Sequence, residues 1–185
     1  KCENYKSILQ VGHIERYNPI IKEKIEKLRD VKSIFSERIG NIDDRNKNIP
    51  ITLDLMIHDI DLIITIINSR IINLKASAKE LVNGLYSKVE CEMIFENGTK
   101  ANLIAKRGNN VKNNRKMLIT CINKIVEIDL LNKKRRIYKE KGGAETWIPI
   151  KNSNPLREEL VDFEKSVRYN QQPIVGVKES CKAVN

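Results

Sequence analysis

Aromatic residues, glycine and proline are all scarce in this chain of 185 residues. Only 5% of the residues are Phe, Trp or Tyr, and the chain contains 8 Gly and 5 Pro. The scarcity of aromatic rings argues against a surface on which nucleic-acid bases stack. Few Gly and Pro, together with 41% hydrophobic residues, argue against extensive disorder. The length then indicates one full globular domain with its own core, with at most a small part of a second domain.

Cysteine and histidine are too few and too scattered for a typical metal site. The four cysteines are Cys2, Cys91, Cys121 and Cys181, and none of them lies within the short spacing of zinc ligands. Only two histidines are present. We therefore expect no bound metal, and thiols that stay reduced in a cytoplasmic protein.

The chain is basic, with 34 Lys and Arg against 24 Asp and Glu and a formal net charge of +10. Such a balance attracts nucleic acid, acidic membranes or phosphorylated small molecules. The densest basic run covers residues 133–136, and we interpret it as the solvated end of a hairpin. We expect neither nucleic acid nor a membrane as a partner; a nucleic-acid-binding protein would show salt-sensitive retention on DNA.

One long apolar run covers residues 49–67. It approaches the length of a membrane-spanning helix, but Asp54, His58, Asp59 and Asp61 interrupt it. Each of these ionisable groups would penalise a helix that spans lipid. We therefore predict a helix that is buried in protein on nearly every face.

Three ionisable residues of this run lie on one stripe of the predicted helix. Asp54, His58 and Asp61 have the offsets i, i+4 and i+7, and one helical turn takes about 3.6 residues. Asp59 points away from the stripe and is interpreted as a rim residue. Three interpretations of the stripe remain open. His58 is a core histidine satisfied by Asp54, or the two residues share a metal ion, or they form a pair for proton transfer in which Asp54 fixes the tautomer of His58.

The remaining pattern predicts an α+β fold. A short strand over residues 8–13 precedes a helix that begins at Asn18-Pro19, and a strand covers residues 31–39. After the buried helix, strands are expected over residues 71–81, 86–95, 99–106, 116–121, 124–130, 135–138 and 146–149. Consecutive strands without helices between them predict a meander, and hence a predominantly antiparallel open sheet with helices on one face. A second copy of the chain would cover the other face, so we expect a homo-oligomer.

Two helices are predicted at the end of the chain. The first begins at Asn154-Pro155, where Asn is a favoured N-cap and Pro suits the first helical position. Its apolar stripe consists of Leu156, Leu160, Phe163 and Val167. The second helix begins near Val177 and stops after barely two turns.

Three segments together resemble the Gfo/Idh/MocA oxidoreductases, the glucose–fructose oxidoreductase and inositol dehydrogenase family. Residues 11–19, Val-Gly-His-Ile-Glu-Arg-Tyr-Asn-Pro, are similar to the crossover from the family's dinucleotide-binding domain into its second domain. Residues 54–61 resemble the family's catalytic helix, which carries an Asp, a His four residues later and a further Asp. Residues 154–175 are similar to its closing helix and proline segment. The chain looks closest to the branch that acts on sugar nucleotides, such as the UDP-N-acetylglucosamine 3-dehydrogenases.

This resemblance implies NAD- or NADP-dependent hydride transfer to or from a carbon of a sugar, sugar nucleotide or polyol. By analogy with the family, His58 would be the acid/base that handles the hydroxyl proton, and Asp54 would orient it or bind a neighbouring hydroxyl. The residues implied to lie near the substrate are Arg16, Tyr17 and Asn18. Asp61 is interpreted as a structural anchor of the helix.

The chain also departs from the family pattern. It contains no Gly-x-Gly-x-x-Gly turn, which cradles the phosphates of a dinucleotide, and no Glu-Lys-Pro segment. We therefore interpret residues 1–12 as a remnant of the last helix and strand of a Rossmann domain. Residues 13–185 would form the C-terminal substrate-binding and oligomerisation domain, truncated at its last helix. We expect no NAD binding by this chain alone.

The resulting hypothesis is the substrate-side domain of a sugar or sugar-nucleotide oxidoreductase that is inactive alone. A separate polypeptide would supply the Rossmann domain. The alternative is a non-catalytic oligomerisation or scaffold module derived from the same fold. The two differ in whether His58 carries chemistry.

Overall fold

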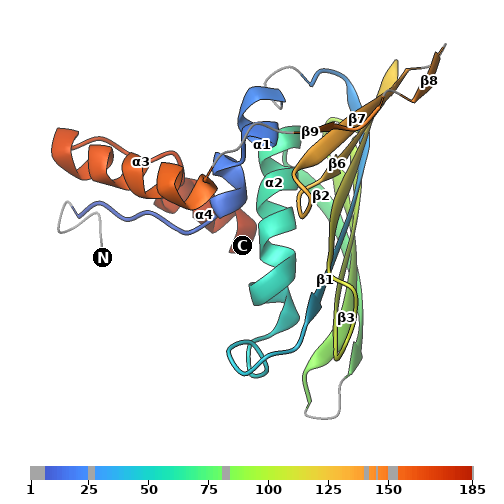
Figure 1. Cartoon of the computed structure of the whole chain (residues 1–185), viewed down its shortest axis with the longest axis horizontal. Coiled ribbons are helices and arrows are strands. Elements are labelled where there is room, and N and C mark those ends of the chain that lie inside the picture. Colours follow the sequence, from blue (N-terminus) through green and yellow to red (C-terminus); the bar gives the residue numbers. More distant parts are fainter. Residues whose placement is uncertain are drawn as a thin grey trace.

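A computed structural model describes residues 7–24, 28–80, 84–139, 142–144, 146–149 and 154–184 of the chain. One large sheet forms a layer, helix α2 runs along one of its faces, and α3 extends away on the far side of α2 (Figure 1). The helical elements are the 3-10 helix η2 (Ile14–Tyr17), α1 (Pro19–Lys24), the π-helix η4 (Thr52–Met56), α2 (Ile57–Ile67), α3 (Pro155–Tyr169) and α4 (Val177–Val184). The α+β class with helices on one face of an open sheet is confirmed.

The sheet contains nine strands, in the order β2-β3-β4-β1-β5-β6-β7-β8, and β9 pairs with β7. The strands are β1 (Val31–Asn41), β2 (Ile71–Glu80), β3 (Tyr86–Phe95), β4 (Lys100–Gly108), β5 (Asn114–Cys121), β6 (Lys124–Asp129), β7 (Lys134–Lys139), β8 (Gly142–Ala144) and β9 (Ile148–Pro149). Neighbouring strands are antiparallel except β1 and β4, which pair in parallel. The expected simple meander is therefore wrong at its centre, because β1 inserts between β4 and β5.

The helix that carries the ionisable stripe has two parts. The π-helix η4 continues directly into α2, and α2 ends at Asn68, which adopts a left-handed conformation. Leu62 and Ile63 of α2 are fully buried in the core against the sheet. Burial is less complete than the apolar run predicts, since Leu53 is 58% exposed. The described helices include none that is long and apolar enough to cross a bilayer.

The segment before η2 differs from its prediction. Residues 7–13 belong to no strand, although their pattern predicts one, and residues 1–6 lie outside the described residues. Instead, the Val11 N–H donates to the Val175 carbonyl at 3.1 Å, and the Gln10 side chain donates to the Glu159 carbonyl at 2.9 Å. The segment therefore runs beside α3 and the turn that follows it, as Figure 1 shows.

The predicted helix at Asn154-Pro155 is confirmed as α3. The Asn154 side chain accepts a hydrogen bond from the Arg157 N–H at 3.1 Å, and Pro155 is the first helical residue. The predicted apolar stripe forms on this helix, but its side chains are exposed to solvent. They are Leu156, Leu160, Phe163 and Val167, with exposed fractions between 38% and 59%. The apolar face of α3 therefore lies outside the hydrophobic core in the described part of the chain.

Candidate functional site

The stripe of α2 and η4 meets three different partners. Asp54 is bound by Arg107 of β4, and Asp61 is bound by Arg16 of η2. His58, between them, faces His13, with ring centroids 6.2 Å apart and ring planes at 89°. Helical spacing predicts one stripe, but the structure does not join the three residues to one another.

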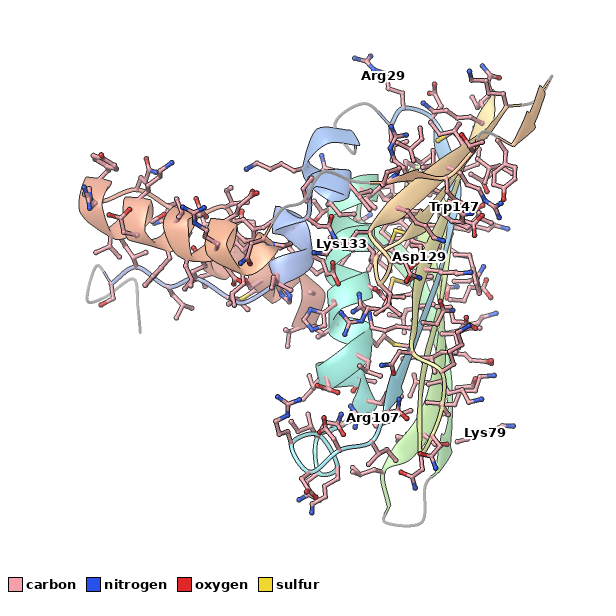
Figure 2. All side chains as sticks on the ribbon, in the orientation of Figure 1. Arg29, Lys79, Arg107, Asp129, Lys133 and Trp147 are labelled. Carbon is pink, nitrogen blue, oxygen red and sulfur yellow. The ribbon has the colours of Figure 1, made fainter. Side chains whose placement is uncertain are left out.

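Asp54 is held away from His58. Its carboxylate accepts a hydrogen bond from Arg107 Nη2, while Arg107 Nη1 donates to the carbonyls of Asn46 and Ile49 at 3.0 and 2.8 Å. Figure 2 shows Arg107 between the sheet and the end of the helix that carries Asp54. Among the described residues, His58 Nδ1 is buried without a hydrogen-bond partner. The expectation that Asp54 fixes the tautomer of His58 is therefore not met by this geometry.

Asp59 is a buried ion-pair residue, and its interpretation as a rim residue is wrong. It is 3% exposed and accepts hydrogen bonds from Arg38 of β1, the shortest at 2.8 Å from Nη2. Arg38 is 2% exposed and also contacts Glu15 at 3.4 Å. Burial and the two carboxylates act on Arg38 in opposite directions, and its pKa is raised. The side of α2 that faces the sheet thus carries a charge, which is compensated by an inward-pointing arginine.

Asp61 anchors η2 to α2. Its carboxylate accepts two hydrogen bonds from Arg16, at 2.7 Å from Nε and 2.5 Å from Nη2. His13 Nε2 lies 3.8 Å from Asp61 Oδ1. Such a two-point guanidinium–carboxylate pair fixes both side chains. The structural interpretation of Asp61 agrees with this geometry, and Asp61 brings His13 toward the helix.

The three residues expected near the substrate bond to different partners in the structure. Arg16 adjoins the His13–His58 pair through Asp61. Tyr17 is 1% exposed, and its hydroxyl donates to Asp162 of α3 at 2.7 Å. Burial and this carboxylate raise the pKa of Tyr17. Asn18 is buried as well, and its side chain bonds to Glu15 and to the backbone of α1. Of the three, Arg16 is the one beside the imidazoles.

Three residues of the cluster went unrecognised as members in the sequence: His13, Glu15 and Arg38. Arg38 did leave a signal. In a strand the side chains alternate between faces, so Arg38 shares the inward face with Ile34 and Ser36. A charged residue at a core-facing position of a strand needs a buried partner of opposite charge. The sequence contains no such signal for His13 and Glu15, because the segment around them shows no clear helix or strand periodicity.

Both imidazoles are shifted toward the neutral form. Burial lowers the pKa of His58, and the positive charges of Arg38 and His13 lower it further against the opposing carboxylates of Glu15 and Asp59. Burial also lowers the pKa of His13, against the opposing charge of Asp61. A neutral imidazole can accept a proton, so the cluster can supply a base near neutral pH.

The lowered pKa values predict a pH-dependent stability. An unfolded histidine titrates near about 6.5, so below that pH the unfolded chain binds more protons than the folded chain. The contribution of His13 and His58 is therefore fully present above about pH 6.5 and is lost as the pH falls toward their lowered pKa values. Urea unfolding at a series of pH values measures this decline. The double variant His13→Gln, His58→Gln should show a flatter dependence in this window; an identical dependence would contradict the assignment.

A separate groove of about 900 Å³ lies between α2, β2 and α4. Its apolar wall includes Ile60, Ile64 and Leu74, and its polar lining includes Arg16 and Lys182. His58 and His13 do not line this groove, so Arg16 is the residue that connects it with the imidazole cluster.

The described residues do not fit a dinucleotide. A Rossmann site needs a glycine-rich turn between a strand and the N-terminus of a helix. The sequence has no such turn, and the strands from β2 to β7 follow one another without a helix between them. The described residues also contain no group of three or more His, Cys, Asp or Glu that could hold a metal ion.

Comparisons with known proteins identify relatives that are oxidoreductases. No family model matches the chain. The UDP-N-acetylglucosamine 3-dehydrogenase of Acidithiobacillus ferrooxidans is 29% identical over 163 residues, which are 85% of this chain and 49% of that protein. The chain therefore spans about half the length of this curated relative.

The solved structures share the fold. A crystal structure of the same Acidithiobacillus enzyme matches with a TM-score of 0.89 and 23% identity, over 99% of this chain and 60% of that one. The aldose–aldose oxidoreductase of Caulobacter crescentus, complexed with glycerol, has a TM-score of 0.83 at 16% identity, over 99% and 60% of the two chains. An Agrobacterium radiobacter oxidoreductase in complex with NAD+ has a TM-score of 0.78 at 11% identity, over 98% and 61%. The resemblance to Gfo/Idh/MocA-type oxidoreductases is confirmed as homology to the Acidithiobacillus enzyme and as a shared fold.

Proposed function

We propose that this chain is the substrate-binding portion of an NAD- or NADP-dependent oxidoreductase that acts on a hydroxyl group of a sugar nucleotide. The observation that carries the proposal is His58, an imidazole with a lowered pKa and an unpartnered buried Nδ1 on the helix that resembles the family's catalytic helix. Homology to a UDP-N-acetylglucosamine 3-dehydrogenase supports the substrate class.

In this proposal His58 accepts the proton of the substrate hydroxyl. A neutral imidazole suits a general base, because its unprotonated ring nitrogen is free to accept the hydroxyl proton. Asp54 lies one turn before His58 and is oriented by Arg107, so its carboxylate is placed to accept a hydrogen bond from a neighbouring sugar hydroxyl. Arg16 and Tyr17 hold the segment that carries His13 against α2 and α3, and Asn18 bonds within that segment and to the start of α1.

NAD or NADP would take up the hydride when bound, and we expect residues outside this chain to hold it. We propose that a Rossmann domain provides the cofactor site, in a separate polypeptide or elsewhere in a longer one. The exposed apolar stripe of α3 offers a surface for such a domain. The outer face of the sheet, where Phe35 is exposed, would pair with a second copy of the chain.

A binding experiment tests the substrate class. UDP-N-acetylglucosamine is titrated into the isotope-labelled chain, and the imidazole signal of His58 is followed by NMR. We expect a saturable shift of this signal with the sugar nucleotide, and a smaller one with UDP, which lacks the sugar. NADH, followed by nicotinamide fluorescence, should not saturate. Saturable NADH binding, or saturation by the sugar nucleotide without any change at His58, would contradict the proposal.

The alternative is a non-catalytic oligomerisation or scaffold module. The observation that favours it is the outer face of the sheet, where Phe35 is exposed and no described helix packs (Figure 1), since such a face suits association and requires no chemistry. A scaffold would tolerate replacement of His58 without loss of turnover in the assembled enzyme. The two functions are therefore distinguished by the same residue.

A further inference from the structure

His13 and His58 are the two histidines of the chain, and the structure brings them together although their sequence numbers differ by 45. Their rings meet edge to face, with centroids 6.2 Å apart. His13 is 4% exposed, and its Nε2 has no hydrogen-bond partner within the described part of the chain. The same holds for the buried Nδ1 of His58. Two buried imidazoles with open hydrogen-bonding positions are costly unless the positions are used.

Charged groups surround this pair from every element that packs on it. Glu15 and Arg16 come from η2, and Arg38 comes from β1. Asp59 and Asp61 come from α2, and Arg115 of β5 approaches Glu15 at 3.9 Å. The carboxylate nearest to His13 is Asp61, at 3.8 Å from Nε2. The cation acting most strongly on His58 is Arg38. Positive charge is therefore better tolerated at the His13 end of the pair than at the His58 end.

We propose that His13 and His58 form a coupled pair that holds one proton between them, with His58 facing the substrate and His13 receiving the proton beside Asp61. This inference rests on the proposed function. The hydroxyl oxygen loses its proton to one ring nitrogen of His58, and the proton on the other ring nitrogen passes to His13. His58 returns to the neutral form, and the charge is compensated by Asp61. The ring separation suits transfer after a small rotation or through one water molecule.

His13 is in this scheme a positioning residue, because it acts through His58. Two imidazolium ions at this distance repel each other, so the pair takes up a second proton less readily than the first. The two rings therefore titrate in macroscopic steps that belong to the pair. Charge repulsion between the rings changes the apparent pKa alone, whereas a shared proton also makes the tautomer of His58 depend on His13.

The chain is suited to a direct test because it contains two histidines. Long-range proton–nitrogen NMR spectra of the labelled chain, recorded between about pH 5 and 8, report the protonation and tautomer of each ring. The variants His13→Gln and His58→Gln assign the signals. We expect His13→Gln to raise the apparent pKa of His58 and to change its tautomer ratio, and His58→Gln to raise that of His13 in return. Ser166→Ala, at a fully buried position in α3, is the matched control and should leave both curves unchanged.

An unchanged titration of His58 in folded His13→Gln overturns the proposal, and so do two independent one-proton curves in the wild-type chain. If His13→Gln does not fold, the half-buried position of His58 makes His58→Gln the informative variant, and the wild-type curves decide the matter on their own. Failure of the proposed function gives a different result from failure of the histidine pair. Coupled rings without binding of UDP-N-acetylglucosamine would reject the substrate and keep the pair, whereas binding at His58 with uncoupled rings would reject the pair alone.

Discussion

Replacing Asp59 by alanine is expected to lower the free energy of unfolding by about 3–5 kcal/mol, since removing one partner of a buried ion pair leaves the other charge uncompensated. Arg38 would remain 2% exposed with Glu15 as its remaining carboxylate, at 3.4 Å. A domain of ordinary stability has about 5–15 kcal/mol in total, so this loss is a large part of it. Urea denaturation followed by circular dichroism measures the change.

Two matched variants define the origin of this effect. Glu96→Ala removes the exposed partner of Arg70, and the expected cost is about 0–1 kcal/mol. The double variant Arg38→Met, Asp59→Leu removes this ion pair and should recover part of the loss, because an apolar pair avoids the desolvation cost while Glu15 loses its partner at 3.4 Å and keeps Arg115 at 3.9 Å. A loss below about 1 kcal/mol for Asp59→Ala would show that water reaches Arg38 in solution.

The second large effect is expected in catalysis. In an enzyme assembled by joining this chain to a nicotinamide-dinucleotide-binding domain, His58→Ala should lower kcat by about 10²–10⁴-fold, the usual contribution of a general acid/base. In the pH profile of kcat/KM, the limb that reports the titration of His58 should disappear as well. Steady-state oxidation of UDP-N-acetylglucosamine, followed by nicotinamide absorbance, measures both.

Lys32→Ala is the control for this experiment, since it alters an exposed residue on β1 away from the imidazole pair. It should leave kcat unchanged. Turnover by His58→Ala that equals that of the control would favour the scaffold function. The thermal unfolding curve of His58→Ala separates a loss of folding from a loss of chemistry. We expect the variant to fold, because His58 is half-buried.

The sequence predicts the elements of this fold better than their pairing. Strand periodicity located β3, β5 and β6 closely, because alternation along a strand is a local property. The parallel pairing of β1 with β4 could not be predicted in this way, since it depends on contacts between segments that are distant in sequence. A meander was the simplest arrangement compatible with local patterns, and the insertion of β1 required the tertiary fold.

The orientation of α2 shows the same limit at the site. Spacing placed Asp54, His58 and Asp61 on one stripe, whereas in the structure the three residues contact three different elements. Spacing did not show which side of the helix faces the sheet, because apolar residues occupy almost every side of the run. Asp59 therefore looked like a rim residue, although it points toward Arg38 on β1. Partners such as Arg107 and His13 come from other elements, and a helical pattern contains no information about them.

The central position of β1 also has a consequence for how the chain folds. Strands β2, β3 and β4 form one set of hairpins, and β5, β6 and β7 form another, so each set makes mostly short-range contacts. Of the described strands, β1 alone joins the two sets, through Ile34 with Ala101 on one side and Ile119 on the other. Long-range pairing forms slowly because a long loop must close first. Docking of β1 is therefore the step that unites the sheet, and it is also the step that buries Arg38 beside Asp59.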